Sequence, residues 1–329
     1  MTVTGTIGIA SSTGAGIAAD VVRNADVALY VGKAAGKNRH DTFSDDMHAA
    51  VMERVTLEQD LREGIRRGEL MLHYQPKVDA VSGQLRGVEA LVRWNHPTRG
   101  LLLPDAFIPL AEQSGLVTDL DHWVLQTACH QAQAWSASGA TPIPVAVNVS
   151  ARDLTAVPFL TRLQSVLAET GIDPRLLELE ITESAAISRH SDTVQLLQGV
   201  RDLGVRIAID DFGTGYSALS RLQGFPLDTL KIDLSFVRAI DGPGTEAPIV
   251  DAMIAMGRRL GLVVVAEGVE TEAQRDYLAE RGCFQLQGYL ISRPIGAPQL
   301  EELMRPSADP PAVEEVLSIL QLPAASTAA

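Results

Sequence analysis

One stretch of the sequence predicts both the kind of fold and the kind of site: Ile209-Asp210-Asp211-Phe212-Gly213-Thr214-Gly215-Tyr216. It starts as an apolar strand, ends in two adjacent carboxylates and continues into a loop that contains glycines. Adjacent carboxylates that both stay ionised are best stabilised by a nearby cation. The same arrangement recurs along the chain, where acidic or amide residues close short apolar runs at Glu89, Asn148, Glu180, Asp210 and Glu267. This recurrence indicates a metal-dependent enzyme.

Outward from this stretch, short apolar segments alternate with amphipathic helical ones from Leu70 onward. Strands are expected near 70–78, 84–94, 143–149, 176–182, 205–210, 228–232, 262–267 and 285–290. Strands alternating with helices predict an α/β fold, here a TIM-like (β/α)8 barrel, which takes about 250 residues. The first two strands are joined only by residues 79–83, a connection too short for a parallel crossover. We therefore expect one antiparallel strand in the barrel.

Composition excludes several classes of partner. The net charge of −14 and the pI of about 4.9 argue against an open basic surface for a nucleic acid polymer or an anionic membrane. The two cysteines, Cys129 and Cys283, lie far apart in no metal-binding or redox spacing, which suits a reducing compartment. No apolar run approaches the roughly 20 residues that span a bilayer. We expect a cytoplasmic protein.

Side-chain alternation along the strands predicts which polar groups share a face. Glu89 and Arg93 lie on one side of their strand, as do Glu178 and Glu180 of theirs, and Lys231 and Asp233 of another. Chemistry in TIM barrels sits where the carboxyl ends of the strands meet. Hard oxygen donors without Cys or His select Mg²⁺ or Mn²⁺, and the scattered histidines show no zinc spacing.

Asp210 and Asp211 are neighbours, so in a regular strand their side chains point to opposite faces. We therefore expect Asp211 to lie in the turn after the strand. A single carboxylate is more often a solvated charge or a helix cap. Several near strand ends, with an amide besides, are hard to explain as surface charge: Glu89, Asn148, Glu180, Asp210, Asp211, Asp233 and Glu267.

The motifs carry a family resemblance. They include His73-Tyr74-Gln75-Pro76-Lys77, Glu89-Ala90-Leu91-Val92-Arg93-Trp94, Asn148-Val149-Ser150, Glu180-Ile181-Thr182-Glu183, the Asp-Asp-Phe-Gly-Thr-Gly-Tyr run, Lys231-Ile232-Asp233, Ala266-Glu267-Gly268-Val269-Glu270 and Gln287-Gly288-Tyr289. In their order and number they resemble an EAL-domain cyclic-di-GMP phosphodiesterase. The resemblance places this domain at residues 55–308, with a C-terminal tail at 309–329.

The resemblance implies a role for each matching residue. Glu89, Asn148, Glu180 and Asp210 would hold one metal, and Asp211 and Glu267 a second, with two Mg²⁺ or Mn²⁺ ions per site and Asp210 able to bridge them. The catalytic group would comprise Lys231, which holds the attacking water, Glu267, and Glu183, which anchors the loop 212–219. Substrate would be bound by Gln75, Arg93, Asp233, Glu270 and Gln287.

The function that the resemblance implies is metal-dependent hydrolysis of cyclic-di-GMP, a bacterial second messenger, to linear pGpG. Two alternatives stay open: a non-catalytic cyclic-di-GMP receptor or interaction module, and a hydrolase that prefers another small phosphodiester such as pGpG. Every assignable motif position is filled, which favours the enzyme. Besides cyclic-di-GMP, the expected partners are a second copy of the chain and a possible upstream sensor domain.

The N-terminal segment resembles a different family. Residues 1–43 are expected to form a strand at Val3–Ala10, a helix ending near Gly36 and a basic turn. The segments Thr6–Ala10, Ala25–Tyr30 and Gly36–Arg39 resemble the end of a GGDEF diguanylate-cyclase domain, without its signature motif or catalytic half. We expect a truncated remnant without cyclase activity. A helical linker at 44–54 would join it to the main domain.

Overall fold

The computed structural model describes residues 4–11, 18–34, 36–155, 158–188, 190–214, 224–242 and 244–304. In this part of the chain, eight strands close into a barrel: β3 (Leu70–Asp79), β4 (Leu85–His96), β6 (Val145–Asn148), β7 (Leu177–Thr182), β8 (Arg206–Phe212), β9 (Thr229–Ile232), β10 (Val263–Ala266) and β11 (Gln285–Leu286). Neighbours pair in chain order, and β3 closes the ring by pairing with both β4 and β11.

One strand of the barrel runs against the others. β3 is antiparallel to β4 and to β11, whereas the pairs from β4 through β6, β7, β8, β9 and β10 to β11 are parallel. The predicted TIM-like barrel with one antiparallel strand is therefore confirmed. The tight connection after β3 makes the reversal necessary, because Asp79 accepts hydrogen bonds from the backbone of Val81 and Ser82 and turns the chain at once into β4.

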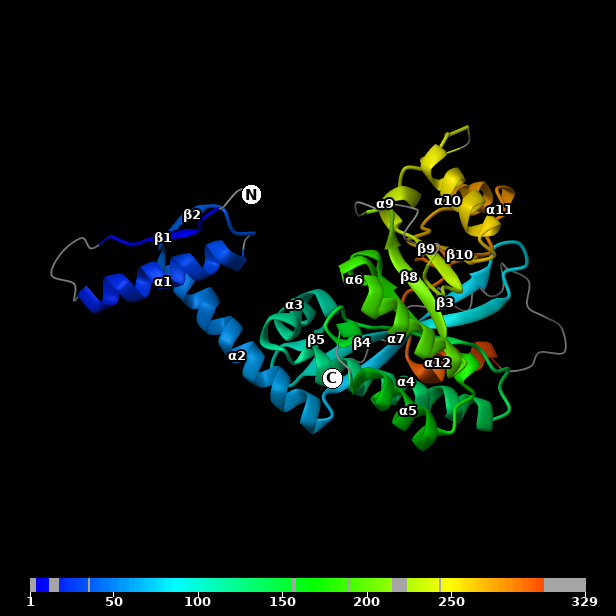
Figure 1. Ribbon diagram of the computed structural model, residues 1–329, viewed down its shortest axis with the longest axis horizontal. Helices are drawn as coiled ribbons and strands as arrows, with labels where there is room; N and C mark the ends of the chain where they lie inside the picture. The colour runs from blue at the N-terminus through cyan, green and yellow to red at the C-terminus, as the bar shows by residue number, and fades with distance from the viewer. Residues whose placement is uncertain are drawn as a thin grey trace, which may run out of the picture.

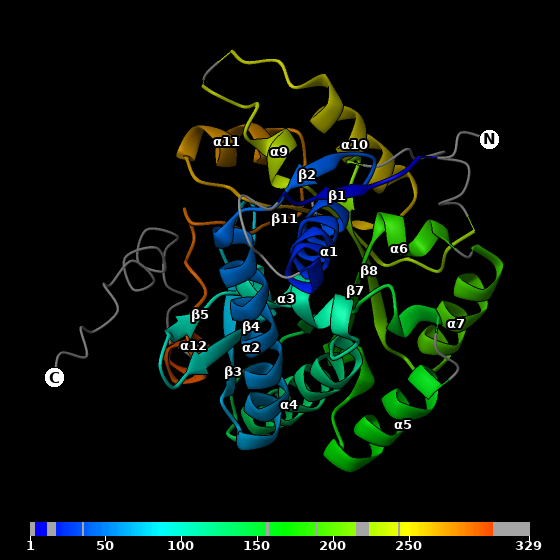
Figure 2. The same ribbon diagram turned by 90° about the vertical axis from the view of Figure 1, so that its left-hand side faces the viewer.

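Helices surround the barrel, as Figures 1 and 2 show. They are α3 (Pro104–Ser114), α4 (Val117–Ala137), α5 (Pro158–Thr170), α6 (Glu183–Ser188), α7 (His190–Asp202), α9 (Leu234–Val237), α10 (Pro248–Arg259), α11 (Glu272–Glu280) and α12 (Ala297–Met304). Outward-facing strand residues such as Leu179, Ile207 and Leu230 are fully buried beneath them. The barrel interior is left to the alternate, largely polar positions.

The N-terminal residues form a small unit beside the barrel (Figure 1). β1 (Ile7–Ile9) and β2 (His40–Thr42) make a two-stranded parallel sheet, on which α1 (Ala18–Ala34) packs. The long helix α2 (Asp45–Arg67) connects this unit to β3 and ends at Gly68, whose φ of 73° is left-handed. α2 continues without a break past residue 54, where we expected the linker to end.

Two local features differ from what the sequence predicts. The last barrel strand covers only Gln285–Leu286 instead of 285–290. A short strand, β5 (Gly100–Leu102), forms an unexpected hairpin with β4. The predicted C-terminal tail and loop residues 215–219 lie outside the described residues. None of the described helices is long and apolar enough to cross a membrane.

Candidate active site

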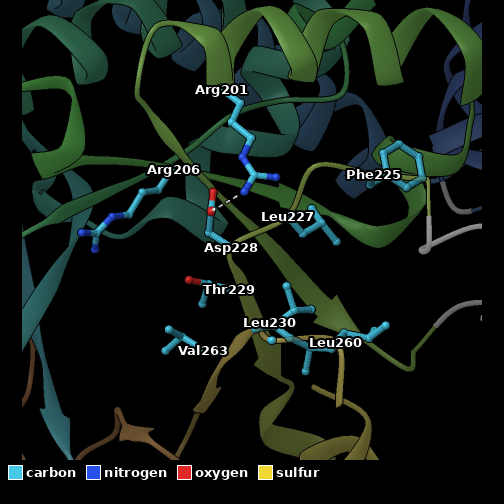
Figure 3. A pocket seen from close by; sticks show the side chains of 11 residues that line it. Arg201, Arg206, Phe225, Leu227, Asp228, Thr229, Leu230, Leu260 and Val263 are labelled. Carbon is cyan, nitrogen blue, oxygen red and sulfur yellow. Dashed lines mark ion pairs between the residues drawn. The ribbon is translucent and has the colours of Figure 1, made fainter. Parts of the chain in front are cut away.

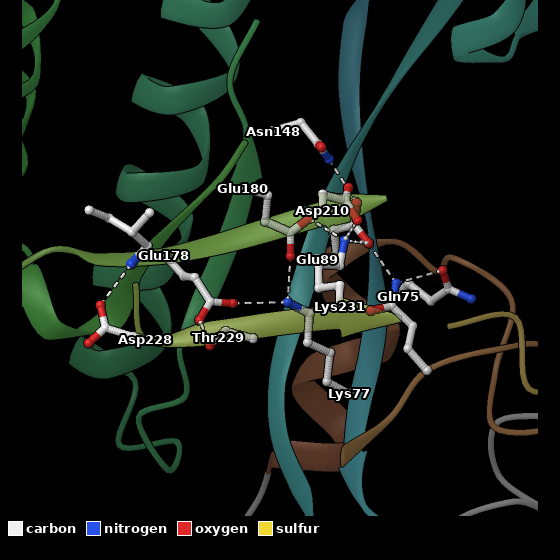
Figure 4. A network of polar contacts seen from close by, with 12 residues as sticks. Gln75, Lys77, Glu89, Asn148, Glu178, Glu180, Asp210, Asp228, Thr229 and Lys231 are labelled. Atoms are coloured by element: carbon white, nitrogen blue, oxygen red, sulfur yellow. Dashed lines mark hydrogen bonds and ion pairs between the residues drawn. The ribbon is translucent and has the colours of Figure 1, made fainter. Parts of the chain in front are cut away.

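The parallel strands bring their polar residues to one end of the barrel (Figure 4). The strand register places Asn148 beside Glu180, and Asp210 beside Thr182. Glu89 lies in β4 beside Ala146, two residues before Asn148 on the neighbouring strand. The polar residues at the carboxyl ends of the strands therefore converge, as the strand pattern predicted.

Lys231 of β9 lies at the centre of this group and is only 1% exposed. Its Nζ is 2.6 Å from Glu180 Oε2 and 2.6 Å from Glu267 Oε1. Asp210 Oδ1 is 3.2 Å away and Glu89 Oε2 is 3.7 Å away. One buried ammonium group thus faces four carboxylates from four different strands or strand ends.

The crowding of negative charge shifts the acidities of these carboxyls. Burial raises the pKa of Glu267 to about 8, with Asp210 adding to the effect and Lys231 opposing it. The pKa values of Glu89 and Asp210 are also raised, mainly by burial and by neighbouring carboxylates. Only Glu180 has a pKa lowered, to about 2, because two lysines outweigh the effect of its burial.

The second of these lysines, Lys77 of β3, forms a layer deeper in the barrel. Its Nζ is 2.6 Å from Glu180 Oε1 and 3.1 Å from Glu178 Oε1. Thr229 Oγ1 donates to Glu178 Oε2 at 2.7 Å. The sequence analysis gave Lys77 no role. Its position two residues after Gln75, on the same face of the strand, was the available signal.

Asp211 does not lie in a turn after the strand, as we expected, but within the last residues of β8. The pairing with β9 shifts between Ile209 and Phe212, and Asp211 adopts a left-handed backbone with φ of 53°. Its backbone N–H donates to Asp210 Oδ1 at 2.9 Å. A bulge breaks the alternation of a regular strand, so adjacent carboxylates need not point to opposite faces. Burial and Asp233 raise the pKa of Asp211.

Glu183 begins α6 and is buried, with 2% of its surface exposed. Its Oε2 accepts the backbone N–H of Gly213 at 2.9 Å. The expected contact with the loop after Asp211 is therefore present at Gly213. That glycine has a φ of 95°, and an added Cβ would lie 2.3 Å from Met253 Cε, so a larger residue cannot replace it without strain.

Two buried glutamines join the site, Gln75 from the reversed strand β3 and Gln287 from the position directly after β11. Gln287 Nε2 donates to Glu89 Oε2 at 2.6 Å and to Gln75 Oε1 at 3.0 Å. Gln75 Nε2 in turn donates to the carbonyl oxygen of Ser292. Gln287 Oε1 is buried and has no hydrogen-bond partner among the described residues. It is an acceptor aimed at a donor that the described chain does not supply.

The remaining predicted substrate residues are placed differently. Arg93 is buried on the same strand face as Glu89, and burial lowers its pKa. Asp233 caps α9, since its side chain accepts the backbone N–H of Ser235. Glu270 lies at the cavity and is 3.7 Å from Arg238. Asn148 Nδ2 donates to Glu89 Oε1 at 2.7 Å.

A cavity of about 270 Å³ opens over this group. Its lining includes Gln75, Glu89, Asp210, Lys231, Glu267, Glu270 and Gln287. A larger cavity, of about 560 Å³, lies at the amino ends of β8, β9 and β10 (Figure 3). There Asp228 faces Arg201 and accepts the N–H of Ile207, beside apolar side chains. The one carboxylate of this larger cavity is already paired with Arg201. The smaller cavity instead gathers Glu89, Asp210 and Glu267 around Lys231, so it is the candidate active site.

The donor chemistry of the site fits hard divalent cations. Its groups are carboxylate and amide oxygens, and two buried acceptors, Glu183 Oε1 and Gln287 Oε1, have no partner among the described residues. However, within the described residues no three His, Cys, Asp or Glu side chains are spaced as ligands of a single ion. The reason is visible in the distances, because the carboxylates are gathered around the Lys231 ammonium group.

Comparison with protein families identifies one match. A family model described as the EAL domain matches residues 58–294. The bifunctional diguanylate cyclase/cyclic di-GMP phosphodiesterase MucR of Pseudomonas aeruginosa is 42% identical over 299 residues, which cover 91% of this chain and 44% of MucR. The cyclic di-GMP phosphodiesterase NbdA of the same organism is 42% identical over 286 residues, 87% of this chain and 36% of NbdA. This chain thus spans less than half the length of either relative.

The fold agrees with a solved structure described as the MucR phosphodiesterase in complex with c-di-GMP. The TM-score is 0.72 and the sequence identity is 44%, over 74% of this chain and 99% of that one. The EAL domain of DcpA from Mycobacterium smegmatis has a TM-score of 0.61 at 38% identity, over 72% of this chain and 96% of that one.

Proposed function

This chain belongs to the EAL domain family, and on that premise we propose that it hydrolyses cyclic-di-GMP to linear pGpG. The observation that carries the proposal is the group of carboxylates around Lys231 at the carboxyl end of a barrel, under a cavity. The names of MucR and NbdA and the c-di-GMP complex of MucR support the same substrate class.

The charge of the site supports two divalent cations as cofactors, Mg²⁺ or Mn²⁺. Two ammonium groups, of Lys77 and Lys231, face a larger set of carboxylates: Glu89, Glu178, Glu180, Asp210, Asp211 and Glu267. When all are ionised, the excess is four negative charges, which two divalent cations neutralise. We assign Glu89, Asn148, Glu180 and Asp210 to one ion, and Asp211 and Glu267 to the other. When bound, such ions lower the pKa of a water and stabilise charge on a phosphodiester.

The chain's own residues then have distinct tasks. The Lys231 ammonium group lines the cavity, where it would hold the attacking water. Glu267, at 2.6 Å, orients that ammonium group. Glu183 keeps Gly213, and with it Asp211, in place. Gln75, Arg93, Asp233, Glu270 and Gln287 face the substrate, and the unpaired Gln287 Oε1 can accept a donor from it.

A non-catalytic receptor is the second candidate. Receptor versions of such a fold lose members of the ligand set, whereas each assigned ligand position here holds an oxygen donor. That observation favours hydrolysis. Preference for pGpG over cyclic-di-GMP is a third outcome, and it predicts a mononucleotide product.

The surrounding segments extend the proposal. The match to MucR covers more of the chain than residues 58–294, which supports a GGDEF-like remnant at 1–43 ahead of a 44–54 linker, the 55–308 domain and a 309–329 tail. The chain would act as a homodimer, with a possible sensor domain upstream. Both cysteines are free and buried, which supports a cytoplasmic setting.

The test is incubation with cyclic-di-GMP and either Mg²⁺ or Mn²⁺, followed by chromatography of the products. We expect pGpG with either ion and none with a chelator. Tight binding of cyclic-di-GMP without turnover in both ions would favour the receptor. Faster conversion of pGpG than of cyclic-di-GMP would favour the third outcome.

A further inference from the structure

The inference concerns Lys77, a buried lysine that the proposed mechanism does not use. Only 3% of its surface is exposed, and its Nζ contacts Glu180 Oε1 and Glu178 Oε1. Burying an ammonium group costs several kcal/mol unless good partners compensate it. The two partners differ in position, because Glu180 belongs to the candidate active site and Glu178 lies two residues deeper along β7. Lys77 therefore links the site to the barrel interior.

The contacts of Glu180 show how this link acts. One carboxylate oxygen, Oε1, is 2.6 Å from Lys77 Nζ, and the other, Oε2, is 2.6 Å from Lys231 Nζ. A carboxylate held at both oxygens by two cations cannot rotate about its terminal bond without losing one of them. Its side chain is fully buried, so water cannot replace the lost contact. Lys77, on the side of Glu180 that faces the deeper part of the barrel, thus fixes the plane of the Glu180 carboxylate.

The deeper layer completes its own contacts without the site. Glu178 Oε2 accepts the Thr229 hydroxyl at 2.7 Å, while Glu178 Oε1 takes Lys77. Glu178 thus balances the charge of Lys77, and it is not among the ion-pair partners of Lys231 in the described residues. Lys77 therefore has two separate effects: its charge is balanced by Glu178, and its position orients Glu180. Substitutions can test the two effects separately.

We propose that Lys77 is a positioning residue: it fixes the Glu180 carboxylate in the orientation in which the site binds its divalent cation. This inference rests on the proposed function for the identity of the ligand set. Removal of a group that hydrogen-bonds to a metal ligand typically lowers metal affinity or activity by about 10- to 100-fold.

The experiment compares variants of the full chain that alter charge and orientation separately. Lys77→Met alone removes one positive charge. That loss by itself makes the site attract cations more strongly. The double variant Lys77→Met/Glu178→Gln removes one charge of each sign, so the net charge of the site is unchanged. Glu178→Gln alone is the matched control, because the amide oxygen of a glutamine can still accept from Lys77 while its NH2 group can donate to the Thr229 hydroxyl. Lys77→Arg keeps the charge with a differently shaped head group.

The measurements are Mn²⁺ affinity by calorimetry without nucleotide, the unfolding temperature, and kcat and KM for cyclic-di-GMP. We expect the double variant to bind Mn²⁺ about tenfold more weakly and to lose kcat by about tenfold or more, while KM stays near wild type. Glu178→Gln loses one negative charge but keeps Lys77 on Glu180 Oε1, so it should lose less Mn²⁺ affinity than the double variant.

A double variant with a lowered unfolding temperature but wild-type Mn²⁺ affinity and kcat would overturn the proposal and make Lys77 purely structural. If the double variant does not fold, Lys77→Arg decides the matter. We then expect weakened Mn²⁺ affinity at a near wild-type unfolding temperature, and wild-type affinity would overturn the proposal. A wild-type protein that binds Mn²⁺ without hydrolysing cyclic-di-GMP would remove the proposed function, yet the calorimetric comparison would still test Lys77.

Discussion

The barrel interior contains two polar layers that differ in their charge balance. In the deeper layer, Lys77 meets Glu178 and one oxygen of Glu180, and Thr229 satisfies the remaining oxygen of Glu178. In the layer above it, Lys231 alone faces Glu89, Glu180, Asp210 and Glu267. The same residue types thus form a balanced group below and an overcharged one above.

The two layers show how buried polar groups that stabilise a fold can be distinguished from buried polar groups that bind a ligand. Buried charges that are paired and hydrogen-bonded keep a fold intact, and removal of one partner is costly. Buried charges of one sign in excess destabilise the fold unless a ligand supplies the opposite charge. Departures from local balance of this kind are expected at functional sites. Lys77 has a place in both layers, because it contacts Glu178 in the deeper one and Glu180 in the upper one.

The largest expected effect is the loss of an upper-layer carboxylate. Glu89→Ala or Asp210→Ala should lower turnover by about a thousandfold or more, the scale of removing one group aimed at transition-state charge. Because each substitution relieves repulsion, the metal-free variants should unfold at the wild-type temperature or above it. Steady-state assays and circular dichroism test both points, with the exposed Glu280→Ala as control. Retained activity in a folded variant would refute the ligand role.

Next in size is the loss of the loop anchor. Glu183→Ala removes the acceptor of the Gly213 N–H without removing any assigned ligand. A misplacement of about 1 Å can cost about a hundredfold in rate, so turnover should fall on that scale and more Mg²⁺ should be needed. Kinetics across a Mg²⁺ titration measure this, with the exposed neighbour Ser184→Ala as control. A wild-type rate and metal dependence in Glu183→Ala would eliminate the anchor.

Metal addition should stabilise the upper layer. A ligand that binds only the folded state at a hundred times its dissociation constant adds about 2.7 kcal/mol to the free energy of unfolding. Mg²⁺ or Mn²⁺ should therefore raise the unfolding temperature of the wild type, and a chelator should reverse the change. The Asp210→Ala variant is expected to show little response. An equal response in both proteins would mean that the ion binds elsewhere.

A smaller effect is expected in the lower layer. Thr229→Val keeps the side-chain shape but leaves Glu178 Oε2 without its hydroxyl donor. An unsatisfied buried acceptor costs about 1–3 kcal/mol, more when charged, so chemical denaturation should show a loss of this size. Turnover should stay close to wild type. A large loss of turnover at unchanged stability would break the distinction between the two layers.

The smallest effect is expected outside the barrel. Deleting residues 1–43 removes the unit of β1, α1 and β2, whereas α2 stays packed on the barrel through Leu61 and Gly64. Turnover and metal dependence should be unchanged. Loss of turnover in a truncated protein whose barrel is intact by circular dichroism would show that this unit regulates or dimerises the enzyme.

Much of this architecture could be predicted because it depends on local pattern. Alternation in the strands placed Glu89, Glu180 and Lys231 on interior faces, and the short connection at 79–83 required β3 to run in reverse. The Lys77 contacts could not be predicted in the same way. They join residues about a hundred positions apart in sequence, and only barrel closure brings β3 and β7 side chains together.

Two other departures have local causes that the sequence does not display. Asp211 adopts a left-handed backbone that is usual for glycine, so the bulge in β8 has no glycine to mark it. β11 stops at Leu286 because the next residues turn onto the loop at Val269, whose N–H donates to Gln287 and whose carbonyl oxygen accepts from Leu290. An apolar sequence pattern does not show whether the backbone will pair within a strand or form hydrogen bonds to a loop.

The reversed direction of β3 determines where the upstream chain meets the barrel. Leu70, its first residue, pairs with Trp94 on the catalytic side of Glu89, so α2 arrives at the end of the barrel that carries the site. The indole of Trp94 donates to Glu69, and an added Cβ on Gly64 of α2 would lie 2.8 Å from the indole nitrogen. Trp94 is the immediate neighbour of Arg93. A rotation of α2 would therefore be transmitted through Trp94 to β4, the strand that holds Glu89 and Arg93.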